Sequence, residues 1–437
     1  MSLLLTNVKA VTMDEDNPFL EEGYVFIQNG VFEKIEEGKP PVHLRDKANR
    51  ILNTHGKWLM PGLVNTHGHM GMTLLRGHSD DLPLHRWLQE KMWPFEAKLD
   101  QKAVEAGRAL AMAEMIKSGT TTFLEMYHLF MDDFAEEIKR VGLRATLMRS
   151  MIGLCPKSEQ EEKLKEAVSF AKNWHQQADG RIRTMLAPHA PYTCPISFVE
   201  RIVEEAKLLN IPVHMHLAET KKEIDDYIHH HGLHPLDELE GKGLLAEVPW
   251  LFAHGVHLSD AHIELLRKYK AAVSHNPISN LKLGSGVAPV VKMLEQGVTV
   301  SLGTDSTASN NTLDMFEEMR MTALIHKGVQ LDSTILPAKT TLKLGTVSGA
   351  KALQLEDIGR IAVGCKADFL LLATSSSHLQ PEEHVMSHLI YSVKSTDVTD
   401  VYVEGNPLME NRELITLDEE KIMAEANEHY KRICKLI

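Results

Sequence analysis

Eight short apolar runs, separated by longer amphipathic stretches, limit most strongly how this chain of 437 residues can fold. The intervening stretches, such as 101–119 and 197–210, space their apolar residues as helices do and end at Gly or Asn. Apolar strands that alternate with helices are typical of a parallel sheet covered on both faces. Eight units predict an α/β fold with a closed (β/α)8 TIM barrel, and a doubly wound open sheet is the alternative. The runs are residues 59–67, 120–126, 143–151, 182–189, 211–219, 251–258, 270–277 and 298–306.

The two ends of the chain have a different pattern, in which apolar and polar residues alternate between turn signals. The strand-like segments there are residues 2–13, 22–37, 50–57, 361–374 and 397–409. We therefore expect a small discontinuous β-sandwich domain made of residues 1–57 and 361–437. The barrel domain would then span residues 58–360.

Charge and composition narrow the range of partners. The formal charge is −13, from 47 basic and 60 acidic residues without a basic stripe, so neither nucleic acid nor an anionic membrane is expected as a partner. No apolar run has the length of a bilayer span, and the first residues do not have the pattern of a secretory signal. The four cysteines form no C-x-x-C pair, which is typical of the cytoplasm. We expect a cytoplasmic protein that acts on a small molecule, and a homo-oligomer is compatible with the sequence.

Imidazole and carboxylate groups gather at the ends of the eight runs, where the active sites of such barrels lie. The first run ends in H-x-H, and the fifth ends in H-x-H-x-x-E. Because residues i and i+2 of a strand point the same way, each pair can chelate one ion, and in the second pair we expect one histidine to ligate. Neutral imidazoles with a carboxylate suit a divalent transition metal that keeps a position open for water. The residues are His67, His69, His189, His214, His216, Glu219, His254, His257, His275 and Asp305.

This combination resembles the metal-dependent amidohydrolase superfamily, in its branch of purine and aminohydrolase-type deaminases. Within that branch the chain is most similar to the 5'-methylthioadenosine/S-adenosylhomocysteine deaminase family. The matching stretches lie within residues 60–320, and the chain ends resemble the small β-domain of that family. They read PGLVNTHGHMGMTLLRG, WPFEAKL, APHAPY, HLAET, AHGVHL, SHNPISNLKLGSGVAPV and LGTDSTASNN.

The resemblance implies a mononuclear metal site. Its ligands would be His67, His69, His216 and Asp305, with water completing the site, and His214 would support them. Some relatives with two metals carry a bridging lysine at the end of strand 4, where this chain reads LAPHAPY, so one ion is expected. Three histidines and an aspartate suit Zn²⁺, and Fe²⁺, Mn²⁺, Co²⁺ and Ni²⁺ are compatible with them.

The resemblance also implies the groups that would deaminate an adenine ring by hydrolysis. A bound metal lowers the pKa of its water toward roughly 7. His254 and Asp305 would accept the proton of this water and orient it. Glu219 would protonate ring atom N1 and then the departing amine, a role worth ~10²–10⁴-fold in rate.

Substrate contacts are implied in the same way. Glu96 would bond the ribose hydroxyls, His189 and Glu219 the purine, and Arg149 the 5' substituent. The second arginine that the family uses for an amino-acid tail is missing after Arg149, and Lys157 is the nearest cation in the sequence. The apolar residues that would cover a methylthio group are Leu82, Leu84, Trp87 and Trp93.

These implications predict an enzyme that converts 5'-methylthioadenosine, S-adenosylhomocysteine or adenosine to the inosine analogue and ammonia. The alternative is another aminohydrolase of the same branch, such as a guanine deaminase or a triazine-type hydrolase. Glu96 favours a nucleoside, because a free base has no ribose to hold. A metal-free barrel that serves as a scaffold would show decay in the ligand set, and the set is complete.

Overall fold

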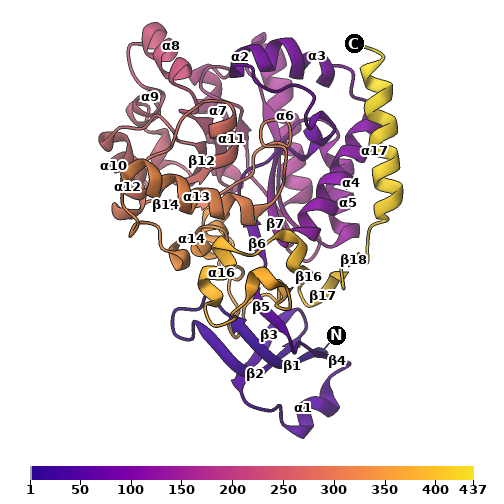
Figure 1. Ribbon diagram of the computed structural model, residues 1–437. Coiled ribbons are helices and arrows are strands. Elements are labelled where there is room, and N and C mark those ends of the chain that lie inside the picture. The colour runs from indigo at the N-terminus through magenta and orange to yellow at the C-terminus, as the bar shows by residue number, and fades with distance from the viewer. Residues whose placement is uncertain (1) are drawn as a thin grey trace.

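The computed structural model describes residues 2–437, which form a barrel of parallel strands with a broad sheet at one end (Figure 1). The helices surround the barrel, and the sheet contains strands from both ends of the chain. This arrangement confirms the predicted fold class, an α/β barrel with an additional β-structure built from the two chain ends.

The barrel wall consists of two arcs of parallel strands. The strands are β6 (Leu63–Asn65), β7 (Thr120–Tyr127), β8 (Arg144–Met151), β9 (Ile182–Thr184), β10 (Ala187–Pro188), β11 (Val213–Leu217), β12 (Trp250–His254), β13 (Ala272–His275) and β14 (Thr299–Leu302). One arc has the order β10–β8–β7–β6 with β9 beside β8, and the other has the order β11–β12–β13–β14. Isolated parallel bridges join the arcs at both seams, from Gly68 to Asp305 and from Leu186 to Val213. Since β9 and β10 share one position in the wall, the barrel has eight positions, as the eight apolar runs predict.

The helices outside the wall begin and end at residues that favour these boundaries. Asp100 caps the first long helix by accepting the N–H of Ala103 at 3.0 Å. Gly142 and Asn210 end two others in the left-handed conformation, with φ of 98° and 52°. The helices that follow barrel strands are α4 (Gln101–Lys117), α5 (Met131–Val141), α6 (Lys157–Trp174), α7 (Ile196–Leu209), α8 (Lys221–His231), α9 (Pro235–Gly241), α10 (Asp260–Lys268), α11 (Pro277–Lys282), α12 (Val290–Glu295), α13 (Met315–Gln330), α14 (Ala338–Leu344) and α15 (Val347–Ala352). Short 3-10 turns are η1 (Met70–Leu75), η3 (Leu244–Ala246), η4 (Ser377–Leu379) and η5 (Ser395–Asp397).

The nine-stranded sheet at the lower end of Figure 1 joins the two ends of the chain. Its N-terminal strands are β1 (Ser2–Val11), β2 (Phe19–Gln28), β3 (Val31–Glu37), β4 (Arg50–Asn53) and β5 (Lys57–Pro61). Its C-terminal strands are β15 (Phe369–Ala373), β16 (Val398–Val403), β17 (Asn406–Glu410) and β18 (Glu413–Leu414). β5 pairs with β1 on one side and with β15 on the other, so it links the two sets. We propose that this sheet is the core of the discontinuous domain of residues 1–57 and 361–437.

Three further helices lie outside these groups. α1 (Val42–Lys47) belongs to the N-terminal part, and α16 (Val385–Tyr391) lies between β15 and β16. The last helix, α17 (Glu419–Cys434), runs along the side of the barrel, where Arg432 bonds Asp100 at 2.7 Å and Glu419 pairs with Lys117 at 2.7 Å. Within residues 2–437, no helix combines the length of a bilayer crossing with an apolar composition.

Candidate functional site

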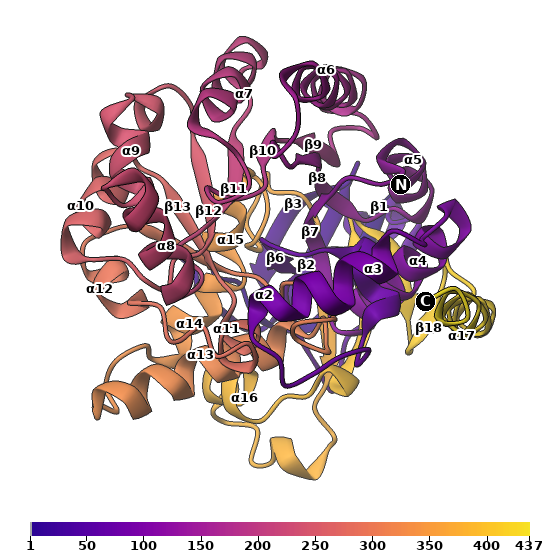
Figure 2. The same ribbon diagram turned by 90° about the horizontal axis from the view of Figure 1, so that it is seen from above.

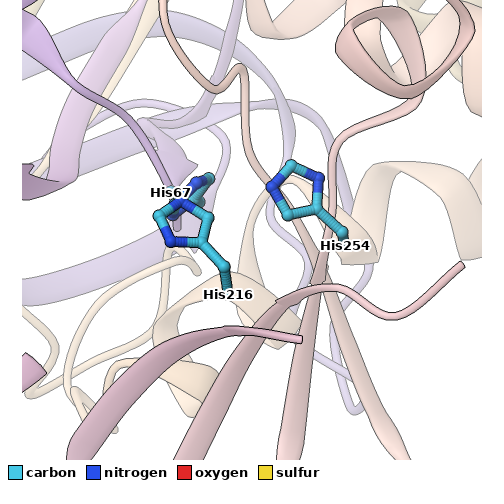
Figure 3. A group of neighbouring side chains, drawn as sticks. All are labelled: His67, His216 and His254. Atoms are coloured by element: carbon cyan, nitrogen blue, oxygen red, sulfur yellow. The ribbon is translucent and has the colours of Figure 1, made fainter. Parts of the chain in front are cut away.

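The predicted metal ligands come together at the C-terminal ends of the barrel strands. His67 and His69 follow β6, His216 is on β11, and Asp305 follows β14. Two overlapping groups of donor atoms share His67, one with His69 and Asp305 and the other with His216 and His254, and within each group the donor atoms lie within 4.8 Å of one another. Figure 3 shows His67, His216 and His254 around one shared space, with the last two on neighbouring strands.

Backbone carbonyls fix the protonation of two of these imidazoles. The Nδ1–H of His69 donates to the carbonyl of Met126 at 2.6 Å, and the Nδ1–H of His216 donates to the carbonyl of His189 at 2.8 Å. A neutral imidazole carries one proton, so both Nε2 atoms have free lone pairs. These two Nε2 atoms lie only 3.2 Å apart. Two lone pairs repel each other at this distance unless a proton or a cation lies between them.

His214 fixes the position of the proton on the third imidazole, that of His67. Its own Nδ1–H donates to the carbonyl of Leu251 at 2.8 Å, so its Nε2 can only accept. It accepts the Nδ1–H of His67 at 2.9 Å, which leaves the Nε2 of His67 as a lone pair. That Nε2 is buried and has no hydrogen-bond partner among the described residues. Since the Nε2 of His214 is already occupied, His214 supports His67 and does not face the shared space.

Asp305 places a negative charge beside the imidazoles. Its Oδ1 lies 3.4 Å from the Nε2 of His67 and 3.2 Å from the Nε2 of His69. Its other oxygen, Oδ2, accepts hydroxyl protons from Ser279 at 2.6 Å and from Ser309 at 2.8 Å. Burial would raise the pKa of Asp305, but the nearby imidazoles of His67 and His69 lower it well below its usual value. The carboxylate is therefore ionised, with one oxygen held and the other directed at the histidines.

This donor set suits a divalent cation. Burial lowers the pKa of His67 to about 3 and that of His216 far below its usual value, so both imidazoles are neutral and free to ligate. Burial also disfavours charge on His69, but the nearby Asp305 carboxylate raises the pKa of His69, which shows that this point attracts positive charge. Three Nε2 lone pairs and one carboxylate oxygen form a donor set typical of zinc and related metals.

His254 and Glu219 lie beside the same space. The Nδ1–H of His254 donates to Oδ1 of Asn280 at 2.8 Å, so its Nε2 is an acceptor, and this Nε2 lies 3.8 Å from Oε2 of Glu219. Burial raises the pKa of Glu219, because charge is costly away from water. One group that can accept a proton and one that can hold a proton therefore face each other beside the ligand set.

A cavity of about 310 Å³ opens from this centre and is covered by a helical segment. The segment consists of α2 (Leu84–Trp87), a π-helical turn η2 (Leu88–Met92) and α3 (Trp93–Glu96). Figure 2 shows α2 and α3 across the end of the barrel that carries the site. Leu84, Trp87 and Trp93 line the cavity, as expected for three of the four apolar candidates, whereas Leu82 is not among the lining residues.

Two of the predicted substrate contacts, Glu96 and His189, line this cavity. Glu96 accepts the hydroxyl proton of Tyr127 at 2.6 Å, and burial raises its pKa. The Nδ1–H of His189 donates to Oγ1 of Thr193 at 2.9 Å, because the Thr193 hydroxyl donates to Ala190. The Nε2 of His189 is therefore an acceptor, and burial lowers its pKa to about 3. The cavity thus offers a carboxylate and a neutral imidazole to a polar substrate.

The lysine that lines the cavity with Arg149 is Lys163. Arg149 lines the cavity and pairs with Glu166 at 2.6 Å. Lys163 lines it as well, with its ammonium 3.0 Å from the carbonyl oxygen of Ile152. Lys157, the nearest cation in the sequence, is exposed at the start of α6 and is not among the lining residues. The two lysines lie less than two helical turns apart, and the sequence could not show which of them faces the barrel axis.

Comparisons with known proteins identify the family of the chain. The model of the amidohydrolase family matches residues 58–408. A 5-methylthioadenosine/S-adenosylhomocysteine deaminase of Shouchella clausii is 56% identical over 433 residues, which cover 99% of this chain and 100% of the relative. A 5'-deoxyadenosine deaminase of Methanosarcina acetivorans is 44% identical over 97% of this chain and 96% of the relative.

A solved structure resembles the whole chain. An adenosine deaminase from Xanthomonas campestris with bound zinc is 38% identical, with a TM-score of 0.93, and the match covers 99% of this chain and 98% of that one. The family model covers most of the chain, and the sequence relatives match the chain from end to end. The chain therefore belongs to the amidohydrolase family, and within it to the family of 5-methylthioadenosine/S-adenosylhomocysteine deaminases.

Proposed function

We propose that this protein is a metal-dependent hydrolase that deaminates the adenine ring of 5'-methylthioadenosine and S-adenosylhomocysteine, with adenosine as a further substrate. The observation that carries the proposal is the convergence of three imidazole lone pairs and one aspartate oxygen at the end of a cavity that also contains Glu219 and Glu96. Relatives that match the chain from end to end are named for this reaction. The proposed cation is Zn²⁺, held by His67, His69, His216 and Asp305.

The protein groups divide the proton transfers between them. When bound, the cation supplies Lewis acidity that makes water a nucleophile near neutral pH. The Nε2 of His254 accepts a proton from the attacking water, and Asp305 shares this task. Burial raises the pKa of Glu219, which favours its protonated form, and from that form Glu219 delivers a proton to N1 of the purine. Once C6 is tetrahedral, the Glu219 carboxylate takes the remaining proton of the attacking oxygen and passes it to the amine, which leaves as ammonia while C6–O becomes a carbonyl. The proton held by His254 or Asp305 then restores the Glu219 carboxyl group.

Recognition of a nucleoside depends on the two groups at the cavity wall. A carboxylate that accepts from two vicinal hydroxyls fits ribose, and the second oxygen of Glu96 is available because Tyr127 bonds Oε1. His189 presents an acceptor nitrogen to the purine. The apolar side chains of the covering segment, Trp87 and Trp93 among them, face the 5' substituent.

The decisive test is ammonia release by the metal-analysed protein. The substrates to compare are 5'-methylthioadenosine, S-adenosylhomocysteine, adenosine, adenine and guanine, by kcat/KM. We expect the methylthio nucleoside to be turned over at least as well as adenosine. Turnover restricted to free bases would contradict the proposal and favour another aminohydrolase of the branch.

Replacing Glu96 tests the ribose contact. In Glu96→Ala the KM for 5'-methylthioadenosine should rise by ~10–100-fold, because two hydrogen bonds to a carboxylate are lost. The measurement is KM for the nucleoside series, with Tyr127→Phe as a control that keeps the carboxylate and should change KM much less. Unchanged kinetics in Glu96→Ala would remove this residue from the ribose site.

Replacing Lys163 tests which lysine binds the amino-acid carboxylate of S-adenosylhomocysteine. In Lys163→Met we expect kcat/KM for S-adenosylhomocysteine to fall by ~10-fold, because a charge-assisted bond to a carboxylate is lost. The value for 5'-methylthioadenosine should not change, because a methylthio group carries no charge. Lys157→Met is the matched control, since Lys157 is exposed on the same helix. An equal effect on both substrates, or an effect of Lys157→Met alone, would contradict this assignment.

The cellular setting is also a proposal. The cysteines of the chain are free thiols in the structure, as fits a reducing compartment. We propose a cytoplasmic enzyme whose partner is its purine nucleoside substrate.

A further inference from the structure

The chain leaves β11 through a strained turn at Ala218, immediately before Glu219. Ala218 has a φ of 53°, a left-handed conformation that is uncommon for residues other than glycine. Its N–H donates to Oε1 of Glu223 at 3.2 Å. Its carbonyl accepts the N–H groups of Val256 at 2.9 Å and His257 at 3.0 Å, from the loop after β12. The peptide groups on both sides of this residue are therefore held.

Glu223 is the residue that holds the other side of the turn. Its carboxylate accepts three consecutive backbone N–H groups, those of Ala218 at 3.2 Å, Glu219 at 2.8 Å and Thr220 at 3.4 Å. Its own N–H donates to Oγ1 of Thr220 at 3.1 Å, which completes a capping box at the start of α8. The side chain is only 3% exposed. A glutamine would offer one acceptor oxygen and would turn an NH₂ group toward these donors.

The three N–H bonds to Glu223 hold the backbone around Glu219, the residue that would move protons in the reaction. The peptide N–H groups before and after the Cα of Glu219 both end on Glu223. The Glu219 carboxyl lines the cavity and faces His254 at 3.8 Å, too far for a hydrogen bond. Because its contact with His254 does not fix its direction, the direction is set through the backbone that Glu223 holds.

We propose that Glu223 is a positioning residue for deamination: by binding the N–H groups of residues 218–220, it directs the Glu219 carboxyl at the reacting ring. This role rests on the proposed function of the site. An ordinary helix cap would contribute only to stability, whereas a misplacement of about 1 Å at a reacting group can cost on the order of 10²-fold in rate. The two roles are therefore separable by kinetics.

The experiment compares Glu223→Ala and Glu223→Gln with His262→Ala, a control variant in the capping box of another helix, α10. His262 occupies the corresponding place in the capping box of α10, where its Nδ1 accepts the N–H of Ser259 at 3.1 Å. We expect kcat for 5'-methylthioadenosine to fall ~100-fold in Glu223→Ala and ~10-fold in Glu223→Gln, with metal content unchanged and a much smaller change in KM, because the direction of the Glu219 carboxyl matters most in the transition state. His262→Ala should leave kcat unchanged while lowering the melting temperature.

The outcomes separate failure of the proposed deaminase function from failure of the positioning role of Glu223. If the wild type releases no ammonia from any nucleoside, the proposed function fails, and crystal structures of metal-loaded wild type and Glu223→Gln then test the positioning role. In these structures the turn at residues 218–220 should differ, and an identical turn would overturn the role. If the wild type is active and both Glu223 variants keep its kcat, the role is also overturned. If Glu223→Ala does not fold, the loss of kcat in Glu223→Gln decides alone.

Discussion

Glu219→Gln should retain its metal and its fold and lose deaminase activity by ~10²–10⁴-fold in kcat, the usual contribution of a well-placed acid–base group. Glutamine has almost the shape of glutamic acid but cannot deliver a proton to N1 of the purine or to the departing amine. Glu219 is 6% exposed, and burial raises its pKa, which favours the protonated form that donates in the wild type. The substitution removes that proton without adding or deleting an ion ligand. The expected loss is in kcat, with little change in KM.

The measurement is steady-state ammonia release from 5'-methylthioadenosine, together with metal analysis of each preparation. Glu204→Gln is a suitable control, because Glu204 is an exposed glutamate on α7 and should behave as the wild type. A Glu219→Gln variant with full metal content and full activity would exclude the proton-transfer role. A variant that lost its metal would show instead that Glu219 contributes to the ion site.

Removal of the metal should have the second large effect, on both activity and stability. Without the cation, activity should fall on the order of 10³-fold or more, since Lewis-acid stabilisation amounts to several kcal/mol. The free energy of unfolding should also fall, because the Nε2 atoms of His69 and His216, 3.2 Å apart, and the Oδ1 of Asp305 are then held together without a cation between them. A ligand at a thousand times its dissociation constant contributes about 4 kcal/mol to stability.

Chelation followed by dialysis and titration with Zn²⁺ measures both effects on one sample. Melting temperature and turnover should recover together, with one equivalent of metal per chain. Recovery that needs two equivalents would contradict the single site built from His67, His69, His216 and Asp305. A chelated protein with unchanged activity and melting temperature would contradict the metal-dependent mechanism.

Much of this molecule could be predicted from patterns that are local in the sequence. The apolar runs became barrel strands, because a strand covered on both faces needs apolar side chains on both faces. The capping and stop residues placed the helices between them, with Gly142 and Asn210 as examples. The H-x-H pair at residues 67–69 follows β6, and because the ends of parallel strands meet at one rim, Asp305 lies beside it.

Other features depend on contacts between segments far apart in the chain. His214 and His216 have the same spacing and the same chemistry, and only the bond from His67 to His214 shows that His216 is the one left facing the shared space. His275 also ends a barrel strand, but it packs against His326, with 3.4 Å between their Nε2 atoms. The helical segment that covers the cavity has no signature that separates a cover from a core helix.

The architecture, the chemistry of the donor set and the family therefore follow from residue type and from spacing along one element. Tertiary contacts are needed to show which imidazole nitrogens are free, which lysine reaches the cavity and which carboxylate holds the turn before Glu219. Those properties depend on hydrogen-bond partners and on the side of a helix that faces the barrel. The fold brings these partners together across separations such as the 147 residues between His67 and His214.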